Sequence, residues 1–171
     1  QATINWFKQG GSIPPNYGWG PSADILIGAD GKECFFTLDG KDFHKTRANW
    51  SAGFGGSSTT TYGADEYGVA IEVAQTGSLE RPTASALDAL IGRCAYLCIT
   101  FDIEPKRINY LAQSKSTPVP SGLVGHEDTA NGRKIGKVDP GPNFPWDWFI
   151  AELKAEIAAR SRQVPPPVGR L

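Results

Sequence analysis

The chain has few cysteines, almost no net charge and no long apolar run, and each of these features excludes a class of protein. It has 171 residues with three cysteines, an odd and sparse set that does not form the disulfide framework of a small secreted domain. Its formal net charge is −1, so no broad attraction to nucleic acid or to an anionic membrane is expected. No run of about 18 apolar residues is present, and the sequence predicts no membrane span. The N-terminus has neither the basic start nor the apolar run of a signal peptide.

The composition is that of an ordinary folded domain. Hydrophobic residues make up 40% of the chain, enough to bury a core. The length predicts one domain, which we place at residues 1–162. Residues 163–171 contain a run of three prolines and are predicted to be an extended tail or linker.

Periodicity predicts an α/β fold with a central mixed β-sheet flanked by helices. Two apolar runs around an Ala-Asp-Gly turn at residues 29–31 predict a β-hairpin. A strand at residues 68–74, with few polar residues, is expected to be central. Two amphipathic helices are expected to begin near Thr83 and Pro145. The remaining expected elements are a short helix at residues 3–9, a long Gly/Ser/Thr-rich loop at 51–66 and an inner strand at 122–127.

Two of the three cysteines are interpreted as core residues. Cys94 and Cys98 are four residues apart in a helical pattern, so they share a helix face. A metal site built on them would need two more ligands, and no His or further Cys lies nearby in sequence. Because free cysteine is commonly buried, we expect both side chains to be buried.

Three polar residues stand in unusual positions. Glu72 lies in an apolar strand, where an unpaired charge is costly, so it is either a solvated or paired side chain or a general base. His126 is one of only two histidines and is, alone, more often structural than catalytic. Asp139 precedes Pro-Gly-Pro and would by itself simply initiate a turn.

Together these residues resemble a known family. Residues 125–146 run Gly-His, a loop with Gly-Arg-Lys, then Lys-Val-Asp-Pro-Gly-Pro and an aromatic residue. This segment resembles the closing signature of the type 2 N-acetylmuramoyl-L-alanine amidases, a family that includes phage endolysins and is structurally akin to peptidoglycan recognition proteins. Residues 22–31, 47–53 and 67–73 are similar to its earlier strand, cleft and Gly-Ile-Glu segments, in the same order.

The resemblance implies a zinc-dependent hydrolase. Carried over by position, two zinc ligands are His126 and Asp139, the catalytic acid/base is Glu72, and the oxyanion-stabilising residue is Lys137. In such sites Zn²⁺ activates water and polarises the amide carbonyl, and an oxyanion donor contributes about 3 kcal/mol. The bond cleaved would join N-acetylmuramic acid to the L-Ala of the peptidoglycan stem peptide.

The match departs from the family at two points. The family's first zinc ligand is a His on an early strand, which we expect upstream of Gln1, so the chain is expected to be trimmed and to need an upstream segment. His44 does not align with that ligand and is more simply an exposed loop residue, although it stays open as a substitute. The loop before Asp139 is about two residues longer than in the family, which makes Lys134 a rival to Lys137.

Three functions remain open at this stage. The first is a phage lysin, made in the host cytoplasm and acting on the host cell wall, with a separate wall-binding domain as a partner. The second is a non-catalytic peptidoglycan-binding module of the same fold. The third, an unrelated hydrolase that uses His44 and His126, leaves the closing motif unexplained.

Overall fold

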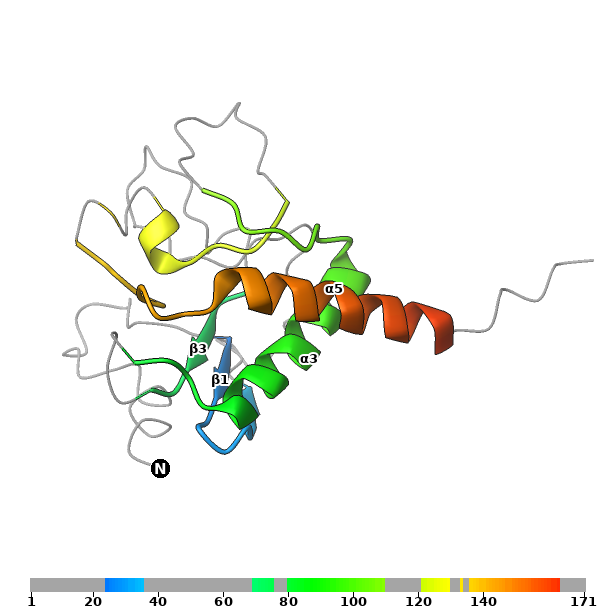
Figure 1. Cartoon of the computed structure of the whole chain (residues 1–171), viewed down its shortest axis with the longest axis horizontal. Coiled ribbons are helices and arrows are strands. Elements are labelled where there is room, and N and C mark those ends of the chain that lie inside the picture. Colours follow the sequence, from blue (N-terminus) through cyan, green and yellow to red (C-terminus); the bar gives the residue numbers. More distant parts are fainter. Residues whose placement is uncertain are drawn as a thin grey trace, which may run out of the picture.

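The computed structural model describes residues 24–35, 69–75, 80–109, 121–129, 133 and 136–163. Within these ranges it contains a small mixed sheet and two long helices (Figure 1). The helix predicted at residues 3–9 and the loop predicted at 51–66 lie outside the described residues, as does the tail beyond Gln163.

The predicted hairpin is confirmed. Strands β1 (Ile25–Ile27) and β2 (Glu33–Phe35) pair antiparallel. The turn between them needs Gly31, whose φ is 79° and where an added Cβ would meet the Ser85 carbonyl oxygen at 2.8 Å. The hairpin therefore packs its turn directly against the start of the following helix.

The third strand, β3 (Ile71–Val73), pairs with β1 in parallel, and the strand order is β2-β1-β3. The strand itself was predicted correctly. Among the described strands β1 is central and β3 is the last in the order. The predicted central position of β3 in the sheet stays a prediction, because the strand order covers the described residues only.

The two amphipathic helices form the rest of the core. Helix α3 (Ala84–Phe101) begins after Thr83, whose hydroxyl accepts a hydrogen bond from the Ala86 N–H, as expected of an N-cap. Helix α5 (Trp146–Gln163) begins one residue after Pro145. The core is closed by residues from both helices and from β1, which are Ile25, Ile27, Leu87, Leu90, Phe149 and Leu153.

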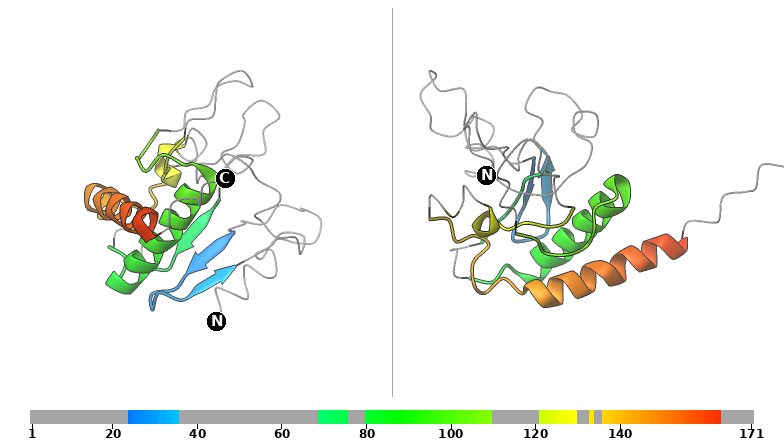
Figure 2. Two further views of the ribbon diagram at one scale, coloured as in Figure 1. Left: turned by 90° about the vertical axis from the view of Figure 1, so that its right-hand side faces the viewer. Right: turned by 90° about the horizontal axis from the view of Figure 1, so that it is seen from above.

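The described helices lie on one side of the sheet. Figure 2 shows α3 against the strands and α5 against α3, on the side away from the sheet. The described part of the chain is therefore α/β, as predicted. It contains no helix on the second face of the sheet. Cys94 and Cys98 are buried in this packing, and Cys34 is half-buried on β2, all three as free thiols.

Helix α3 has the length and the apolar composition of a membrane span, although the sequence predicted none. Its buried side chains include Ala86, Leu87, Leu90, Cys94 and Leu97. They pack in the core of the domain, which accounts for the apolar character of this helix.

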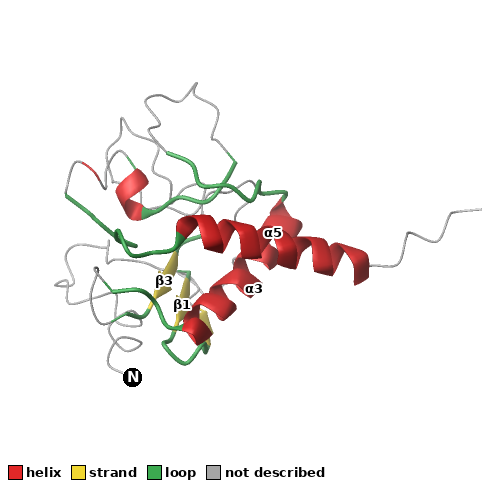
Figure 3. Ribbon diagram, viewed as in Figure 1, coloured by secondary structure: helices red, strands yellow, loops and turns green. Residues whose placement is uncertain are grey.

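The inner strand predicted at residues 122–127 is wrong. Only Leu123 forms a strand-like bridge, parallel to Arg107. Residues His126–Asp128 form a single 3₁₀ turn, η2 (Figure 3). The cause is Asp128, whose carboxylate accepts the Gly125 N–H while its own N–H donates to the Gly125 carbonyl. These local hydrogen bonds compete with strand pairing and turn the backbone.

Candidate active site

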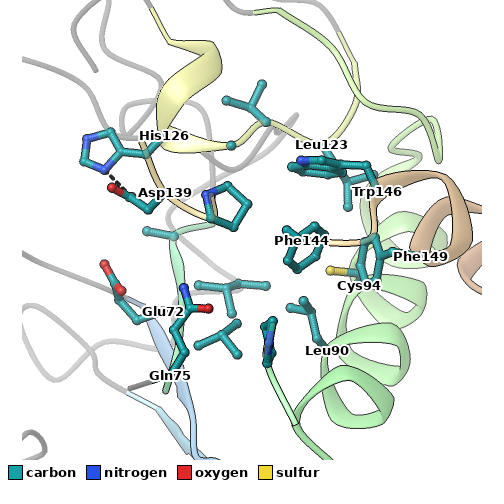
Figure 4. Close-up of a pocket in the computed structure, with 17 residues that line it drawn as sticks. Glu72, Gln75, Leu90, Cys94, Leu123, His126, Asp139, Phe144, Trp146 and Phe149 are labelled. Atoms are coloured by element: carbon teal, nitrogen blue, oxygen red, sulfur yellow. Dashed lines mark hydrogen bonds and ion pairs between the residues drawn. The ribbon is translucent and has the colours of Figure 1, made fainter. Parts of the chain in front are cut away.

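A pocket of about 180 Å³ lies between β3, the η2 turn and the start of α5. Figure 4 shows that its two ends differ in chemistry. Glu72, His126 and Asp139 lie at one end, where their polar atoms face one another. The opposite end is apolar and is formed by Leu90, Cys94, Phe144, Trp146 and Phe149.

His126 and Asp139 are in direct contact. The His126 Nδ1–H donates to Asp139 Oδ2 at 2.7 Å. A second bond joins the two segments, because the Glu127 N–H donates to the Asp139 carbonyl oxygen at 3.0 Å. The hydrogen bond from His126 lowers the pKa of the Asp139 carboxyl, and the positive charge of Lys137 acts in the same direction. Residues 13 positions apart in sequence are therefore held as one pair.

Glu72 faces this pair from β3 (Figure 4). Its side chain is reached by solvent at the pocket mouth, but the surrounding protein removes part of its hydration. This desolvation raises the pKa of Glu72, and the negative charge of Asp139 raises it further, while His126 and Lys137 oppose the shift. A carboxyl with a raised pKa is suited to accept and return protons near neutral pH.

Lys137 lies two residues before Asp139 on an exposed stretch of the loop. Its positive charge lowers the pKa of both Glu72 and Asp139, although Lys137 does not line the pocket itself. Its rival, Lys134, lies outside the described residues, and so does His44.

The donor atoms present fit a zinc ion in part. Imidazole nitrogen and carboxylate oxygen are ordinary zinc ligands, and donors in a tetrahedral zinc site are about 3.3 Å apart. His126 Nδ1 and Asp139 Oδ2 are 2.7 Å apart, so the two atoms would have to move apart by only about half an ångström to admit such an ion. Within the described ranges no group of three His, Cys, Asp or Glu side chains is arranged so that it could hold a metal ion, so Glu72 is not a third ligand beside His126 and Asp139. A third protein ligand would have to come from elsewhere in the chain or from a partner.

Gly125 fixes the spacing between the turn and the Asp139 loop. A Cβ at this position would meet Pro140 Cδ at 2.8 Å and Asp128 Oδ2 at 3.1 Å. The absence of a side chain before His126 is therefore what allows the two loops to touch. The Gly-His pair in the sequence motif reflects this close approach.

Sequence reasoning missed the apolar end of the pocket and its polar rim. Phe144, Trp146 and Phe149 form a cluster in which the Phe144 and Trp146 ring centroids are 4.8 Å apart. Trp146 Nε1 and Gln75 Oε1 are buried and have no hydrogen-bond partner within the described part of the chain, and both side chains line the pocket. Trp146 and Phe149 belong to the apolar face of the helix predicted to begin near Pro145, and periodicity alone gives no sign that such a face borders a cavity.

Comparison with known proteins identifies the family of the chain. A family model described as N-acetylmuramoyl-L-alanine amidase matches residues 1–142. No curated protein and no solved structure matches the chain. Because the family model spans most of the chain and includes Glu72, His126, Lys137 and Asp139, the chain belongs to the type 2 N-acetylmuramoyl-L-alanine amidases, a family of peptidoglycan hydrolases.

Proposed function

We propose that this chain hydrolyses the amide between N-acetylmuramic acid and L-Ala in peptidoglycan with the help of a zinc ion. The observation that supports this most directly is the meeting of Glu72, His126 and Asp139 at one end of a pocket. They come from a strand, a turn and a loop that are far apart in sequence. A structural ion pair has no need of a third, partly desolvated carboxylate beside it. Hydrolysis, in contrast, needs a general base next to the groups that bind the electrophile.

His126 and Asp139 are the residues proposed to hold zinc, together with a ligand beyond the described residues. When bound, zinc supplies a Lewis acid that polarises the scissile carbonyl and makes water more acidic. The lowered pKa of Asp139 keeps this carboxylate ionised and ready to bind a cation over the whole neutral range. Metal binding replaces the hydrogen bond between the two side chains.

Glu72 is proposed as the general base and acid. Its carboxylate takes a proton from the attacking water and returns it to the departing amine of L-Ala. The raised pKa of Glu72 favours the second step, because a protonated carboxyl is then accessible closer to neutral pH. Lys137 is proposed to stabilise the oxyanion that develops on the amide carbonyl.

The aromatic end of the pocket is proposed to exclude water from the reacting end. The indole N–H of Trp146 and the side-chain amide oxygen of Gln75, which have no partner within the described residues, offer one donor and one acceptor on the pocket wall. A peptide unit or an N-acetyl group of the substrate supplies the complementary acceptor and donor. These contacts would orient the wall fragment without taking part in bond breaking.

The biological setting follows from the family resemblance. We propose a phage lysin with an amidase fold akin to peptidoglycan recognition proteins, acting on the host cell wall. A separate wall-binding domain is its proposed partner.

The activity is tested on purified bacterial cell wall. Incubation with the protein and Zn²⁺ is expected to release free L-Ala amino termini, detected by labelling and mass spectrometry of the fragments. Glu72→Gln removes the base while keeping shape, and is expected to lower the rate by about 10²-fold or more. Equal release by wild type and Glu72→Gln would contradict the proposal.

A second outcome points to the alternative function. Two rather than three metal-binding side chains gather at the site in the described segments, which is what a non-catalytic binding module would also show. Sedimentation of the wild-type protein with cell wall, without any release of L-Ala termini even when Zn²⁺ is added, would identify the chain as such a module.

A further inference from the structure

Arg107 lies beside the η2 turn although it comes from a different part of the chain. It follows α3 by a few residues and forms a parallel bridge with Leu123, three residues before His126. Two backbone hydrogen bonds hold this bridge: the Ile108 N–H donates to the Leu123 carbonyl at 2.9 Å, and the Leu123 N–H donates to the Lys106 carbonyl at 2.8 Å. The backbone of Arg107 is therefore fixed against the strand-like residues that lead into the turn.

The guanidinium of Arg107 holds two of the three residues of the turn. Its Nε and Nη2 donate to the two carboxylate oxygens of Asp128, each at 2.8 Å, and Nη2 also donates to Glu127 Oε1 at 2.9 Å. Its Cζ lies 4.5 Å from the centre of the Trp146 ring. This combination of a bidentate carboxylate pair and an aromatic stack is specific to arginine, since lysine offers neither the planar fork nor the stacking face.

Asp128 connects Arg107 to the backbone directly before His126, and Thr129 holds the backbone of His126 itself. The side chain of Asp128 is 7% exposed, and its Oδ2 accepts the Gly125 N–H at 3.1 Å. On the other side, the Thr129 hydroxyl donates to the His126 carbonyl at 2.9 Å. His126 is therefore bracketed between a residue held by Asp128 and a residue bonded to its own carbonyl.

Glu127 connects Arg107 to Asp139, the second proposed zinc ligand. Its side chain accepts from Arg107, and its backbone N–H donates to the Asp139 carbonyl oxygen at 3.0 Å. One guanidinium is thus linked, each time through a single carboxylate residue, to the Gly125 N–H directly before His126 and to the Asp139 carbonyl oxygen. Arg107 itself contacts neither of them.

We propose that Arg107 is a positioning residue that fixes the η2 turn so that the side chains of His126 and Asp139 meet before a metal ion binds. Its effect on metal binding and hydrolysis rests on the proposed function, whereas its hold on the turn does not. A nearly buried Asp128 carboxylate without its arginine would lose its main counter-charge and would have to find water or protonate. The turn would then rearrange, and the two donor side chains would have to be ordered at the moment of metal binding.

The test compares Arg107→Lys with Arg160→Lys. The control arginine also pairs with a carboxylate, Glu156, but does so on the surface of α5. Amide hydrogen exchange of the metal-free proteins is measured first. In Arg107→Lys the amides of Gly125, Glu127 and Thr129 are expected to exchange about tenfold faster or more, as for the loss of charged hydrogen bonds, while the amides in the middle of α3 keep their protection. Arg160→Lys leaves the three turn amides unchanged.

Metal affinity and kinetics provide the second readout. Competition with a chromophoric chelator is expected to show zinc binding weakened about 10- to 100-fold in Arg107→Lys, the range typical of groups that orient metal ligands. On cell wall its kcat falls while KM changes little, because Arg107 orients the ligands and does not contact substrate. Asp128→Asn, which keeps the shape of the acceptor but removes its charge, is expected to show the same local exchange pattern.

Two results would overturn the proposal. One is uniform loss of protection across α3 and the turn in both Arg107→Lys and Asp128→Asn, which would mean a general structural role. The other is unchanged exchange in the turn together with unchanged zinc affinity. If the wild-type chain binds no zinc, the proposed function fails, but the exchange pattern still decides whether Arg107 holds the turn.

Discussion

At the scale of single residues, the site depends on how three ionisable groups share one end of a pocket. Asp139 is stabilised as an anion by its hydrogen bond from His126, and its charge in turn disfavours ionisation of Glu72. The pKa of Asp139 is thus lowered, mainly by the hydrogen bond from His126, whereas the pKa of Glu72 is raised, first by desolvation and then by the charge of Asp139. Such a separation of pKa values is the usual way in which one site obtains both a permanent anion and a proton carrier.

The raised pKa of Glu72 makes a prediction about stability in the metal-free protein. The native state holds this proton more tightly than the unfolded chain, so the native state loses stability as pH rises through the pKa of Glu72 in the folded protein. Glu72→Gln cannot ionise and escapes this loss. Its melting temperature relative to wild type is therefore expected to increase between the ordinary Glu pKa of 4.5 and neutral pH. Thermal unfolding followed by circular dichroism across this range measures the difference, and a difference that shrinks with rising pH would refute the assignment.

Individual residues were predicted unevenly from the sequence. Glu72, His126 and Asp139 were identified because they fall in motifs with defined spacing, and the structure brings them together. Arg107 and Asp128 were not, because a lone arginine after a helix has no pattern of its own. Its partner is about 20 residues away, and only the tertiary fold shows that the two meet.

At the scale of elements, the packing of α3 against α5 supports the pocket. Leu90 and Cys94 from α3 and Phe149 from α5 belong both to the hydrophobic core and to the pocket wall. The site is thus built on the most regular part of the described fold, while its polar residues come from the sheet, a turn and a loop. This arrangement holds the apolar wall fixed.

A glycine inside α3 provides a test of this packing. Gly92 lies in the helix interior, where a Cβ would meet only the terminal Nη2 of Arg160 at 3.4 Å. Because Arg160 is a flexible surface side chain, Gly92→Ala is expected to stabilise the chain by about 0.5–1 kcal/mol through helix propensity. Urea unfolding measures this gain. A loss of stability of similar size would show that α3 and α5 approach each other more closely at Gly92 than described.

Regular elements were the most predictable part of the fold. Both helices and the hairpin follow from apolar periodicity, an N-cap threonine and an Asp-Gly turn, which are local signals. The strand predicted at residues 122–127 failed because the carboxylate of Asp128 captures the Gly125 N–H. The predicted central place of β3 stays a prediction, because an apolar strand beside a pocket has the same composition as one between two others and the strand order covers the described residues only.

At the scale of the whole molecule, the described sheet, helices and loops converge on one pocket with a polar and an apolar end (Figure 4). The α/β class and the amidase family could be predicted from the sequence, since both rest on the order of motifs along the chain. The shape of the pocket could not, because it depends on side chains from segments with large sequence separation. The part of the site that lies beyond the described residues is where the third metal ligand has to be sought.

Zinc binding by matched variants tests the central claim most directly. Titration of the metal-free protein with Zn²⁺ in a calorimeter is expected to show one ion per wild-type chain. Replacing either proposed ligand, in His126→Ala or Asp139→Ala, is expected to weaken zinc binding more than the loss of an outer-shell partner does, which is typically about 10- to 100-fold. Glu72→Gln should bind zinc as the wild type does. Unchanged zinc affinity in His126→Ala or Asp139→Ala, or no binding by the wild type, would contradict the account.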